Sequence, residues 1–379
     1  MKYKKAHSLL TGGHNKHSLR IKFLTIALVF LAFLGVAFVL YSMITTVNYN
    51  RICMKGIEEA AAFEMEKTNN RFFVIFAVSS LLLLYLTFVF KNFTETHTRE
   101  HAEKERIGAE LSMAAEIQAC MLPYVFPPFP DRAEFDIHAS MLPAKEVGGD
   151  FYDFFLIDKN NLAVVIADVS GKGVPAALFM GITKTLIKSC VRSGKSPGEV
   201  FKTINNVLCE NNGKGMFVTA FMGYYNIETG SFVYVNAGHT PPLLKKTGKD
   251  YESMYTKPCF ILGCINNIVY EETEIFLEPG DTLYLYTDGV TEAMNTNRSF
   301  FTSQRLVEVL NNNKDSRPGE LLSAVKREID DFAGGADQAD DITMLALKVD
   351  HYTQPEQSEQ YDYENYLIEA AIEELPVEG

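Results

Sequence analysis

Two long apolar stretches without a charged residue lie in the first quarter of the chain. The first covers Phe23 to Val47 and the second covers Phe72 to Phe90, which are 25 and 19 residues long. At about 1.5 Å of rise per helical residue, the shorter stretch spans about 28 Å, close to the bilayer's hydrocarbon thickness of about 30 Å. The first stretch is too long for the apolar part of a signal peptide. We therefore predict transmembrane helices at residues 23–47 and 72–90.

The charges that flank these stretches predict the orientation of the chain in the membrane. Residues 1–22 hold six Lys and Arg residues and no acidic residue, whereas residues 48–71 hold four basic and four acidic residues. Because positive charge favours the cytoplasmic side, we expect a cytoplasmic amino terminus and an extracytoplasmic loop at 48–71. Two spans then return the rest of the chain to the cytoplasm. The expected localisation is the cell (plasma) membrane, with the lipid bilayer as a partner.

A charged, helix-forming segment at residues 91–121 is predicted to link the spans to the rest of the chain. Near its end, a stripe of mostly apolar residues recurs at alternating spacings of four and three. A short coiled coil that pairs two chains as a homodimer fits this pattern, and so does an amphipathic helix packed on its own domain. Pro123 and the prolines after it are expected to end the helix. The stripe consists of Ile107, Leu111, Ala114, Gln118 and Met121, with Ile117 beside it.

From Phe135 onward, short apolar runs alternate with two pairs of helical segments. The sequence from Ser196 to Glu199 is a capping-box pattern, and turn residues at 228–230 and 279–280 predict hairpins. Hairpin-linked strands with inserted helix pairs favour an α+β fold of packed sheet layers. Strands are predicted near 135–141, 151–157, 162–168 and 342–349, and helices near 175–192, 197–210, 302–311 and 318–332.

Composition limits the classes of function. The 379-residue chain has a net charge of −13, which disfavours nucleic acid as a partner because phosphate backbones attract Lys and Arg. Six Cys residues are scattered without metal-binding pairs, which indicates reduced thiols in a cytosolic domain. The acidic tail at residues 351–379 is predicted to be a mobile appendage.

Candidate chemistry lies in acidic residues at the ends of the apolar runs. Asp168 ends one such run and is followed by a Ser-Gly-Lys-Gly loop. Three further segments carry acids beside Gly or beside a second acid, and a sheet would be able to gather all of them at one place. Clustered carboxylates repel one another, and an all-oxygen set without His or Cys favours a hard cation, Mg²⁺ or Mn²⁺. These further acids are Asp150 and Asp153, Asp288, and Asp340 and Asp341.

Five ordered motifs resemble the SpoIIE/RsbU-like branch of the PPM (protein phosphatase 2C type) serine/threonine phosphatases. They are EVGGDFYD, ADVSGKGVPAALFM, NAGHTPPLL, LYTDGVTEAMN and DDITML, and the resemblance covers about Ala119 to Asp350. It implies a PPM-type phosphatase domain at residues 122–350 with the αββα sandwich of that family. The amino-terminal third of the chain lies outside the resemblance.

The resemblance also implies a site for two Mn²⁺ or Mg²⁺ ions. Asp168 is then the carboxylate that bridges both ions, with the Val169 carbonyl as a further ligand. Asp150 is expected on one ion, and Asp288 and Asp340 on the other. Such a cation pair lowers the pKa of a bridging water and lets hydroxide attack phosphorus without a covalent enzyme intermediate.

Two further acids and two possible phosphate contacts complete the expected site. Asp153 and Asp341 are expected to support the ligands. Because Asp340 and Asp341 are adjacent and a strand alternates its faces, only one of these two is expected to point at the metals, and Asp340 is chosen because it matches the first Asp of the motif. Eukaryotic-type members have a His after the metal-binding Asp-Gly, whereas this chain has Ser170 two residues after its Asp. The general acid is therefore open, and Lys172 and His239 are candidates for contacting phosphate or the leaving group. A solvated Lys and a structural His are the alternatives.

These features predict a membrane-anchored, metal-dependent serine/threonine protein phosphatase. The resemblance implies that its substrate is a phosphoserine or phosphothreonine regulatory protein, a STAS-domain anti-anti-sigma factor, in bacterial signal transduction. One alternative is a catalytically silent PPM-like signalling scaffold, but all the expected metal carboxylates are present. A second alternative, a metal-dependent hydrolase of small phosphoesters, would use the same acids.

Overall fold

The computed structural model describes residues 30, 33–51, 58–210, 212–257 and 259–352. It divides into two units, Met1–Ile107 and Gly108–Gly379, and each is described by itself. The first unit contains a helix at Phe33–Arg51 and most of helix α2, Glu58–Met121. The ring of Phe72 in α2 stacks on the ring of Tyr41, with 4.0 Å between ring centroids. The two helices therefore contact each other through aromatic side chains.

Helix α2 joins the predicted second span and the predicted linker into one helix of 64 residues. This segment contains no Pro and a single Gly, Gly108, so the sequence holds no strong helix breaker before Met121. The helix ends two residues before Pro123, where the sequence predicts its end. In the predicted loop at residues 48–71, residues 48–51 and 58–71 are helical.

Three described helices are long and apolar enough to cross a membrane. Two of them, Phe33–Arg51 and α2, overlap the predicted spans, and no residue of their apolar windows is buried in the described part of the chain. Residues 23–29, 31 and 32 of the predicted first span lie outside the described residues. The third helix, α3 at Val174–Arg192, packs on a sheet of the second unit and is partly buried.

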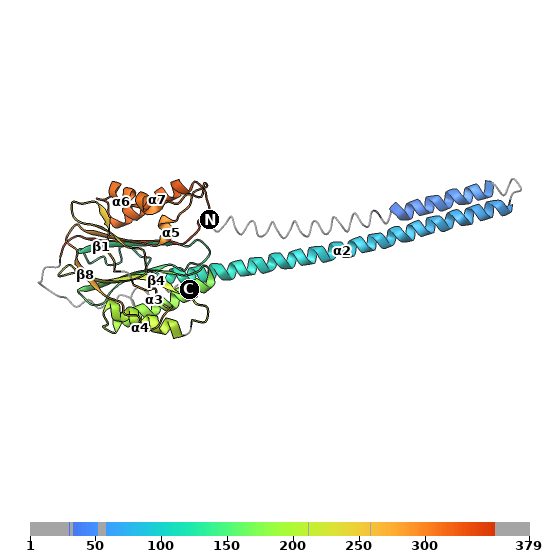
Figure 1. Cartoon of the computed structure of the whole chain (residues 1–379). Helices are drawn as coiled ribbons and strands as arrows, with labels where there is room; N and C mark the ends of the chain where they lie inside the picture. The colour runs from blue at the N-terminus through green and yellow to red at the C-terminus, as the bar shows by residue number, and fades with distance from the viewer. Residues whose placement is uncertain (1–29, 31–32, 52–57, 211, 258, 353–379) are drawn as a thin grey trace, which may run out of the picture. The chain divides into compact units, whose positions relative to one another are not determined.

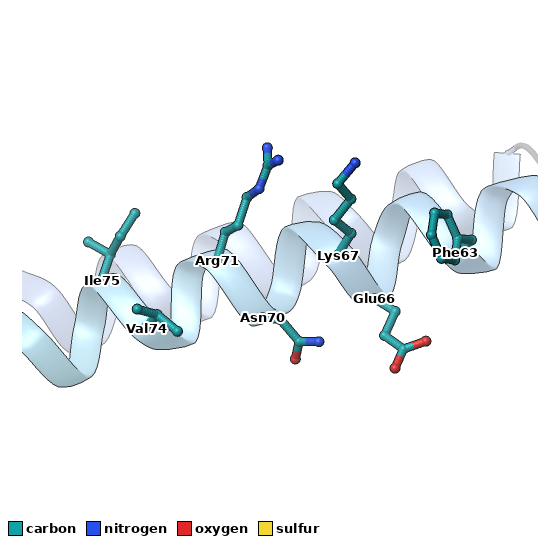
Figure 2. A pocket seen from close by; sticks show the side chains of 7 residues that line it. All are labelled: Phe63, Glu66, Lys67, Asn70, Arg71, Val74 and Ile75. Carbon is teal, nitrogen blue, oxygen red and sulfur yellow. The ribbon is translucent and has the colours of Figure 1, made fainter.

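A shallow hollow of about 750 Å³ lies along the first turns of α2 (Figure 2). Lys67 and Arg71 extend to one side of the helix, and Glu66 and Asn70 extend to the other. None of the acids predicted to bind metal lines this hollow. Its lining residues are Phe63, Glu66, Lys67, Asn70, Arg71, Val74 and Ile75.

The second unit consists of two antiparallel sheets between two helix pairs (Figure 1). Helices α6 (Thr302–Asn312) and α7 (Pro318–Ala333) cover the sheet β1-β10-β9-β6-β7, and α3 and α4 (Pro197–Glu210) cover the sheet β2-β3-β4-β5-β8. The predicted α+β fold with αββα layers is thus confirmed for this unit. The strands are β1 Phe135–Leu142, β2 Phe151–Leu156, β3 Asn161–Val169, β4 Val218–Asn226, β5 Ser231–Ala237, β6 Leu243–Lys245, β7 Tyr251–Ser253, β8 Thr273–Phe276, β9 Thr282–Tyr286 and β10 Ile342–Val349.

Strand β10 shows how one strand supplies two apolar cores. Ile342, Met344 and Ala346 belong to the core that α6 and α7 cover, whereas Leu345 and Leu347 belong to the core that includes the second sheet. Successive side chains of a strand point to opposite faces, so this alternation places β10 between the two cores. Because both faces are covered, most residues of the strand are apolar, and polar and apolar residues do not alternate along it.

One predicted hairpin is wrong. The turn at 279–280 joins β8 to β9, and these two strands belong to different sheets because β8 pairs with β5 while β9 pairs with β10 and β6. The buried carboxylate of Asp281 accepts hydrogen bonds from the backbone N–H groups of Glu278 and Thr247, which holds the chain in this crossing. The hairpin around 228–230 is confirmed, since it joins the paired strands β4 and β5.

Candidate metal and phosphate site

The loops that carry the predicted acids meet at one end of the sandwich. Asp150 directly precedes β2, and Asp168 lies near the end of the neighbouring antiparallel strand β3. Asp288 follows β9 and begins the short helix α5, Asp288–Thr291, while Asp340 lies two residues before the start of β10. Because β9 and β10 are antiparallel neighbours, the end of one lies beside the start of the other.

These carboxylates lie close enough together to repel one another electrostatically. Burial and the nearby charge of Asp288 raise the pKa of Asp168 to about 6. Burial and the charge of Asp168 raise the pKa of Asp150 well above its ordinary value. Burial and the charge of Asp340 raise the pKa of Asp288. The site therefore gathers more negative charge than it neutralises, and a cation would relieve the repulsion.

The donor chemistry fits hard divalent cations such as Mg²⁺ and Mn²⁺. The gathered side chains offer carboxylate oxygens only, without a thiolate or an exposed imidazole. Gly149 lies against the Val169 carbonyl, because an added Cβ at position 149 would be 2.8 Å from that oxygen. Among the described residues, no three His, Cys, Asp or Glu side chains already converge on one ion-sized centre. The acids are gathered, but their side chains are not arranged as a closed coordination shell.

Thr287 fixes the orientation of Asp150. Its hydroxyl group donates a hydrogen bond to Asp150 Oδ2 at 2.7 Å and accepts one from the backbone N–H of Thr343 at 3.1 Å. Thr287 directly follows β9 beside Thr343 of β10, and it is fully buried. Asp150 is therefore held from the opposite sheet, next to the residue that begins α5.

Asp341 holds the loop that carries Asp150. Its carboxylate accepts hydrogen bonds from the backbone N–H groups of Ala144 at 2.7 Å and Gly149 at 2.6 Å. Asp341 is 5% exposed, whereas the neighbouring Asp340 is only partly buried. The two adjacent acids thus have different surroundings, as their adjacency predicts, and Asp341 supports the backbone of the site.

Gln118, expected in the stripe of the linker helix, contacts the same loop. Its side-chain amide donates to the Gly148 carbonyl at 2.7 Å and accepts from the Gly148 N–H at 3.0 Å. Gln118 is 8% exposed, so the last turns of α2 pack against their own domain at this point. The sequence signal for this contact was a polar residue within an otherwise apolar stripe.

Lys172 and His239, the two candidates for contacting phosphate, have different surroundings. Lys172 Nζ lies 2.9 Å from Asp340 Oδ2, at the rim of the acidic cluster. His239 is 5% exposed, and its Nδ1 lies 2.8 Å from the hydroxyl group of Thr219, the residue opposite Asp168 in the sheet. Burial lowers the pKa of His239 to about 4. A neutral, enclosed imidazole supports the strands beneath the cluster rather than facing solvent.

Asp153 lies apart from the other acids. Its carboxylate forms a buried ion pair with Lys184 of α3, and it also accepts a hydrogen bond from its neighbouring backbone N–H. This pair joins β2 to the helix on the outer face of the sheet. We expected Asp153 to support the metal ligands, but among the described residues it makes no direct contact with them.

Comparison with known proteins identifies the family. The model of the family "Stage II sporulation protein E (SpoIIE)" matches residues 158–350. The chain is 35% identical over 268 residues to Protein IcfG of Synechocystis, with 63% of this chain and 41% of IcfG covered. It is 30% identical over 258 residues to phosphoserine phosphatase RsbU of Bacillus subtilis, with 67% and 74% covered. The chain thus spans less than half of IcfG and about three quarters of RsbU.

Solved structures agree with this assignment at the level of the fold. The SiaA-PP2C domain of Pseudomonas aeruginosa has a TM-score of 0.57 and 22% identity, with 66% of this chain and 99% of that domain covered. The phosphatase domain of SpoIIE from Bacillus subtilis, solved with a fragment of its regulatory domain, has a TM-score of 0.51 and 22% identity, with 58% and 64% covered. The resemblance found from the five motifs is confirmed, and the chain belongs to the SpoIIE family of PPM-type phosphatases.

Proposed function

We propose that the chain is a membrane-anchored, metal-dependent serine/threonine protein phosphatase that dephosphorylates a regulatory protein. The observation that carries this proposal is the convergence of the acids at one end of the sandwich, with the pKa of Asp168 raised to about 6 by burial and by the charge of Asp288. A bound cation would offset the repulsion between these carboxylates. Because the chain belongs to a phosphatase family, we propose that this cation serves phosphoester hydrolysis.

The residues that would hold the ions follow from the motifs and the placement of the loops. Asp168 and the Val169 carbonyl would lie between two ions, with Asp150 on one, and Asp288 and Asp340 on the other. Two bound divalent cations would supply a nucleophilic water at neutral pH and offset the charge of the phosphoryl oxygens. Around them, Thr287 orients Asp150, and Asp341 fixes the backbone of the loop that carries it.

A phosphorylated protein is a suitable substrate for this site. Asp168, Asp288 and Asp340 are each only partly buried, so the acids open to the surface rather than into a closed pocket. A phosphoserine or phosphothreonine on an exposed loop is therefore able to reach them. The relatives RsbU and RsbP of Bacillus subtilis are named phosphoserine phosphatases, which supports the same class of substrate. We propose a STAS-domain anti-anti-sigma factor as the phosphoprotein.

The test is phosphate release by the purified full chain in detergent. A phosphorylated STAS-domain protein from the same organism is the substrate, with Mn²⁺ or Mg²⁺ in one arm and a chelator in the other. We expect turnover that needs the cation and is lost in Asp168→Asn, because that change removes anionic charge from the centre of the site. Turnover that persists in the chelator would contradict the metal-dependent mechanism.

Two comparisons separate the alternative functions. Faster hydrolysis of p-nitrophenyl phosphate than of the phosphoprotein would support a small-phosphoester hydrolase. Stable binding of the phosphoprotein without phosphate release would support the silent scaffold.

The membrane anchor and a homodimer through the linker are parts of the same proposal. The apolar windows of Phe33–Arg51 and α2 support the anchor, because no part of the described chain buries them. Met113 and Ile117 are 64% and 61% exposed on the last turns of α2, which supports pairing with a second chain there. Sedimentation in detergent should then show a dimer that Ile117→Lys weakens, and a wild-type monomer would contradict the pairing.

A further inference from the structure

Lys172 lies between two glycines on the loop that joins β3 to α3. Its Nζ atom is 2.9 Å from Asp340 Oδ2, and it also donates a hydrogen bond to the backbone carbonyl of Ala339. Among the described residues, no other Lys or Arg forms an ion pair with the acids at this end of the sandwich. The ammonium group is therefore the only positive charge in the described chain that pairs directly with the cluster.

The ammonium group of Lys172 lies beside carboxylates that we expect to bind a divalent cation. Lys172 pairs directly with Asp340, and its positive charge also attracts the neighbouring carboxylate of Asp288. These are the two carboxylates that our proposed function assigns to the second ion. A carboxylate oxygen occupied by an ammonium group is less available to a metal ion.

The loop gives Lys172 the freedom to leave this position. Gly171 and Gly173 have φ values of +86° and +76°, which L-residues with a side chain rarely adopt. An added Cβ at Gly171 would meet nothing within 4 Å, and one at Gly173 would meet only Lys145 Cδ, at 3.9 Å. The glycines thus serve the backbone conformation rather than close packing. The side chains of Lys172 and Asp340 are also 36% and 37% exposed, so solvent reaches the pair.

We propose that Lys172 is a tethered cation that occupies Asp340 when the second divalent ion is absent and is displaced when that ion binds. This inference rests on the proposed two-ion site and names a control on its loading. The pair reduces repulsion in the metal-free chain, and it sets a threshold of cation concentration for assembling the site. Lys172 is in this sense a positioning residue, because it acts through Asp340.

The first test measures binding of Mn²⁺ to the full chain in detergent by isothermal titration calorimetry, without substrate. We expect Lys172→Met to tighten binding at one site by about five- to tenfold, since an exposed ion pair contributes up to about 1 kcal/mol and a neighbouring positive charge is also lost. Lys172→Arg, which keeps the charge, should bind like the wild type.

Lys145→Met is the matched control. It removes the same charge from a residue beside the same loop that has no ion pair with the cluster among the described contacts, and it should change affinity less than about twofold. Equal gains in Lys172→Met and Lys145→Met would mean a general field effect and would overturn the proposal. Weaker Mn²⁺ binding in Lys172→Met would also overturn it.

The second test follows the lysine itself. Brief labelling with an amine-reactive ester, read by mass spectrometry, should modify Lys172 faster when Mn²⁺ is present, because the displaced ammonium group loses its partner. Lys145 should react at the same rate with and without Mn²⁺. Slower or unchanged labelling of Lys172 would contradict displacement.

The results distinguish a failure of this inference from a failure of the proposed function. Unchanged Mn²⁺ binding in Lys172→Met together with a raised KM for the phosphoprotein would make Lys172 a phosphate contact and overturn only the inference. Competition between Lys172 and Mn²⁺ without any phosphate release would overturn the phosphatase proposal and leave the inference intact.

Discussion

Gly289 occupies a position that no other residue fits. It follows Asp288 at the start of α5, and an added Cβ there would overlap the backbone carbonyl of Asp341. We predict that Gly289→Ala forces apart the two segments that carry Asp288 and Asp340 and lowers the free energy of unfolding by about 3 kcal/mol. Thermal melting of the full chain in detergent measures this loss.

Gly108→Ala is the control for that substitution. An added Cβ at Gly108 in α2 meets nothing within 4 Å, and Ala favours a helix over Gly by up to about 1 kcal/mol. We expect the Gly108→Ala chain to melt at the wild-type temperature or above. A Gly289→Ala chain as stable as the wild type would mean that α5 moves freely against β10.

The adjacent acids Asp340 and Asp341 should respond differently to the same change. Asp341→Asn keeps one acceptor oxygen but replaces the other with an amide that cannot accept from a backbone N–H. We expect a loss of about 1–3 kcal/mol of stability, because one of the hydrogen bonds to Ala144 and Gly149 is lost in a buried place. Asp340→Asn should leave the melting temperature nearly unchanged and abolish hydrolysis. A loss of stability in Asp340→Asn, with a loss of hydrolysis but not of stability in Asp341→Asn, would mean that the two residues have the opposite roles.

His239 should make stability depend on pH. Its folded pKa of about 4 is below its ordinary value of 6.5, so the unfolded chain binds a proton first as pH falls. Stability from this group is complete above pH 6.5 and is lost as pH falls toward 4, by up to about 3 kcal/mol.

His239→Asn should remove this contribution. The raised pKa of Asp168 acts in the opposite direction in both chains, so the difference in their melting temperatures against pH isolates His239. Parallel curves between pH 6.5 and 4 would show that the imidazole is not held neutral.

At the level of elements, Gln118 ties the last turns of α2 to the loop before β2. Gln118→Leu removes both hydrogen bonds to Gly148 and leaves a buried N–H and a buried carbonyl without their partner. We predict faster hydrogen exchange at residues 146–150, since each unmade buried bond costs about 1–3 kcal/mol. Glu116→Ala, at an exposed neighbour, should leave that exchange unchanged. Equal exchange in both variants would show that the loop is held by Asp341 alone.

Most element boundaries could be predicted from sequence because local patterns set them. The helix α4 begins at Pro197, as the capping-box pattern predicts, and the Ser196 N–H donates to the Glu199 carboxylate at 3.0 Å. The strand β10 was predictable from its largely apolar run. The turn at 279–280 was misread because turn residues show where the chain reverses but not which strand each arm pairs with. Strand pairing depends on residues far away in the sequence.

The acidic residues of the candidate site could be predicted from the sequence, but their side-chain contacts could not. Asp150, Asp168, Asp288 and Asp340 stand in motifs of local sequence, and the fold brings their loops together. The ion pair of Lys172 with Asp340 joins residues 168 positions apart, and no local pattern specifies it. The spacing around Gln118 fits both a coiled coil and a helix packed on its own domain, since helical spacing gives a face but not the surface that it contacts.

For the molecule as a whole, the orientation in the membrane follows from charge and from helix continuity. Residues 1–22 carry six basic residues and no acid, so we predict that they stay in the cytoplasm. Helix α2 runs without a break from Glu58 to Met121, so the second predicted span and the linker form one helix. A chain that crosses twice then has its phosphatase unit in the cytoplasm. The third apolar helix, α3, does not alter this topology, because its Lys184 is buried in an ion pair with β2.

Fusions to alkaline phosphatase, which is active only outside the cytoplasm, measure this topology. A fusion after Lys67 should be active, because that residue lies between the two predicted spans. A fusion after Arg106 should be inactive, and so should one after Arg192, since α3 is a helix of the folded domain rather than a third crossing. Activity after Arg106 with none after Lys67 would reverse the orientation. Activity after Arg192 but not after Arg106 would make α3 a span, and the sheet that it covers could not then form as described.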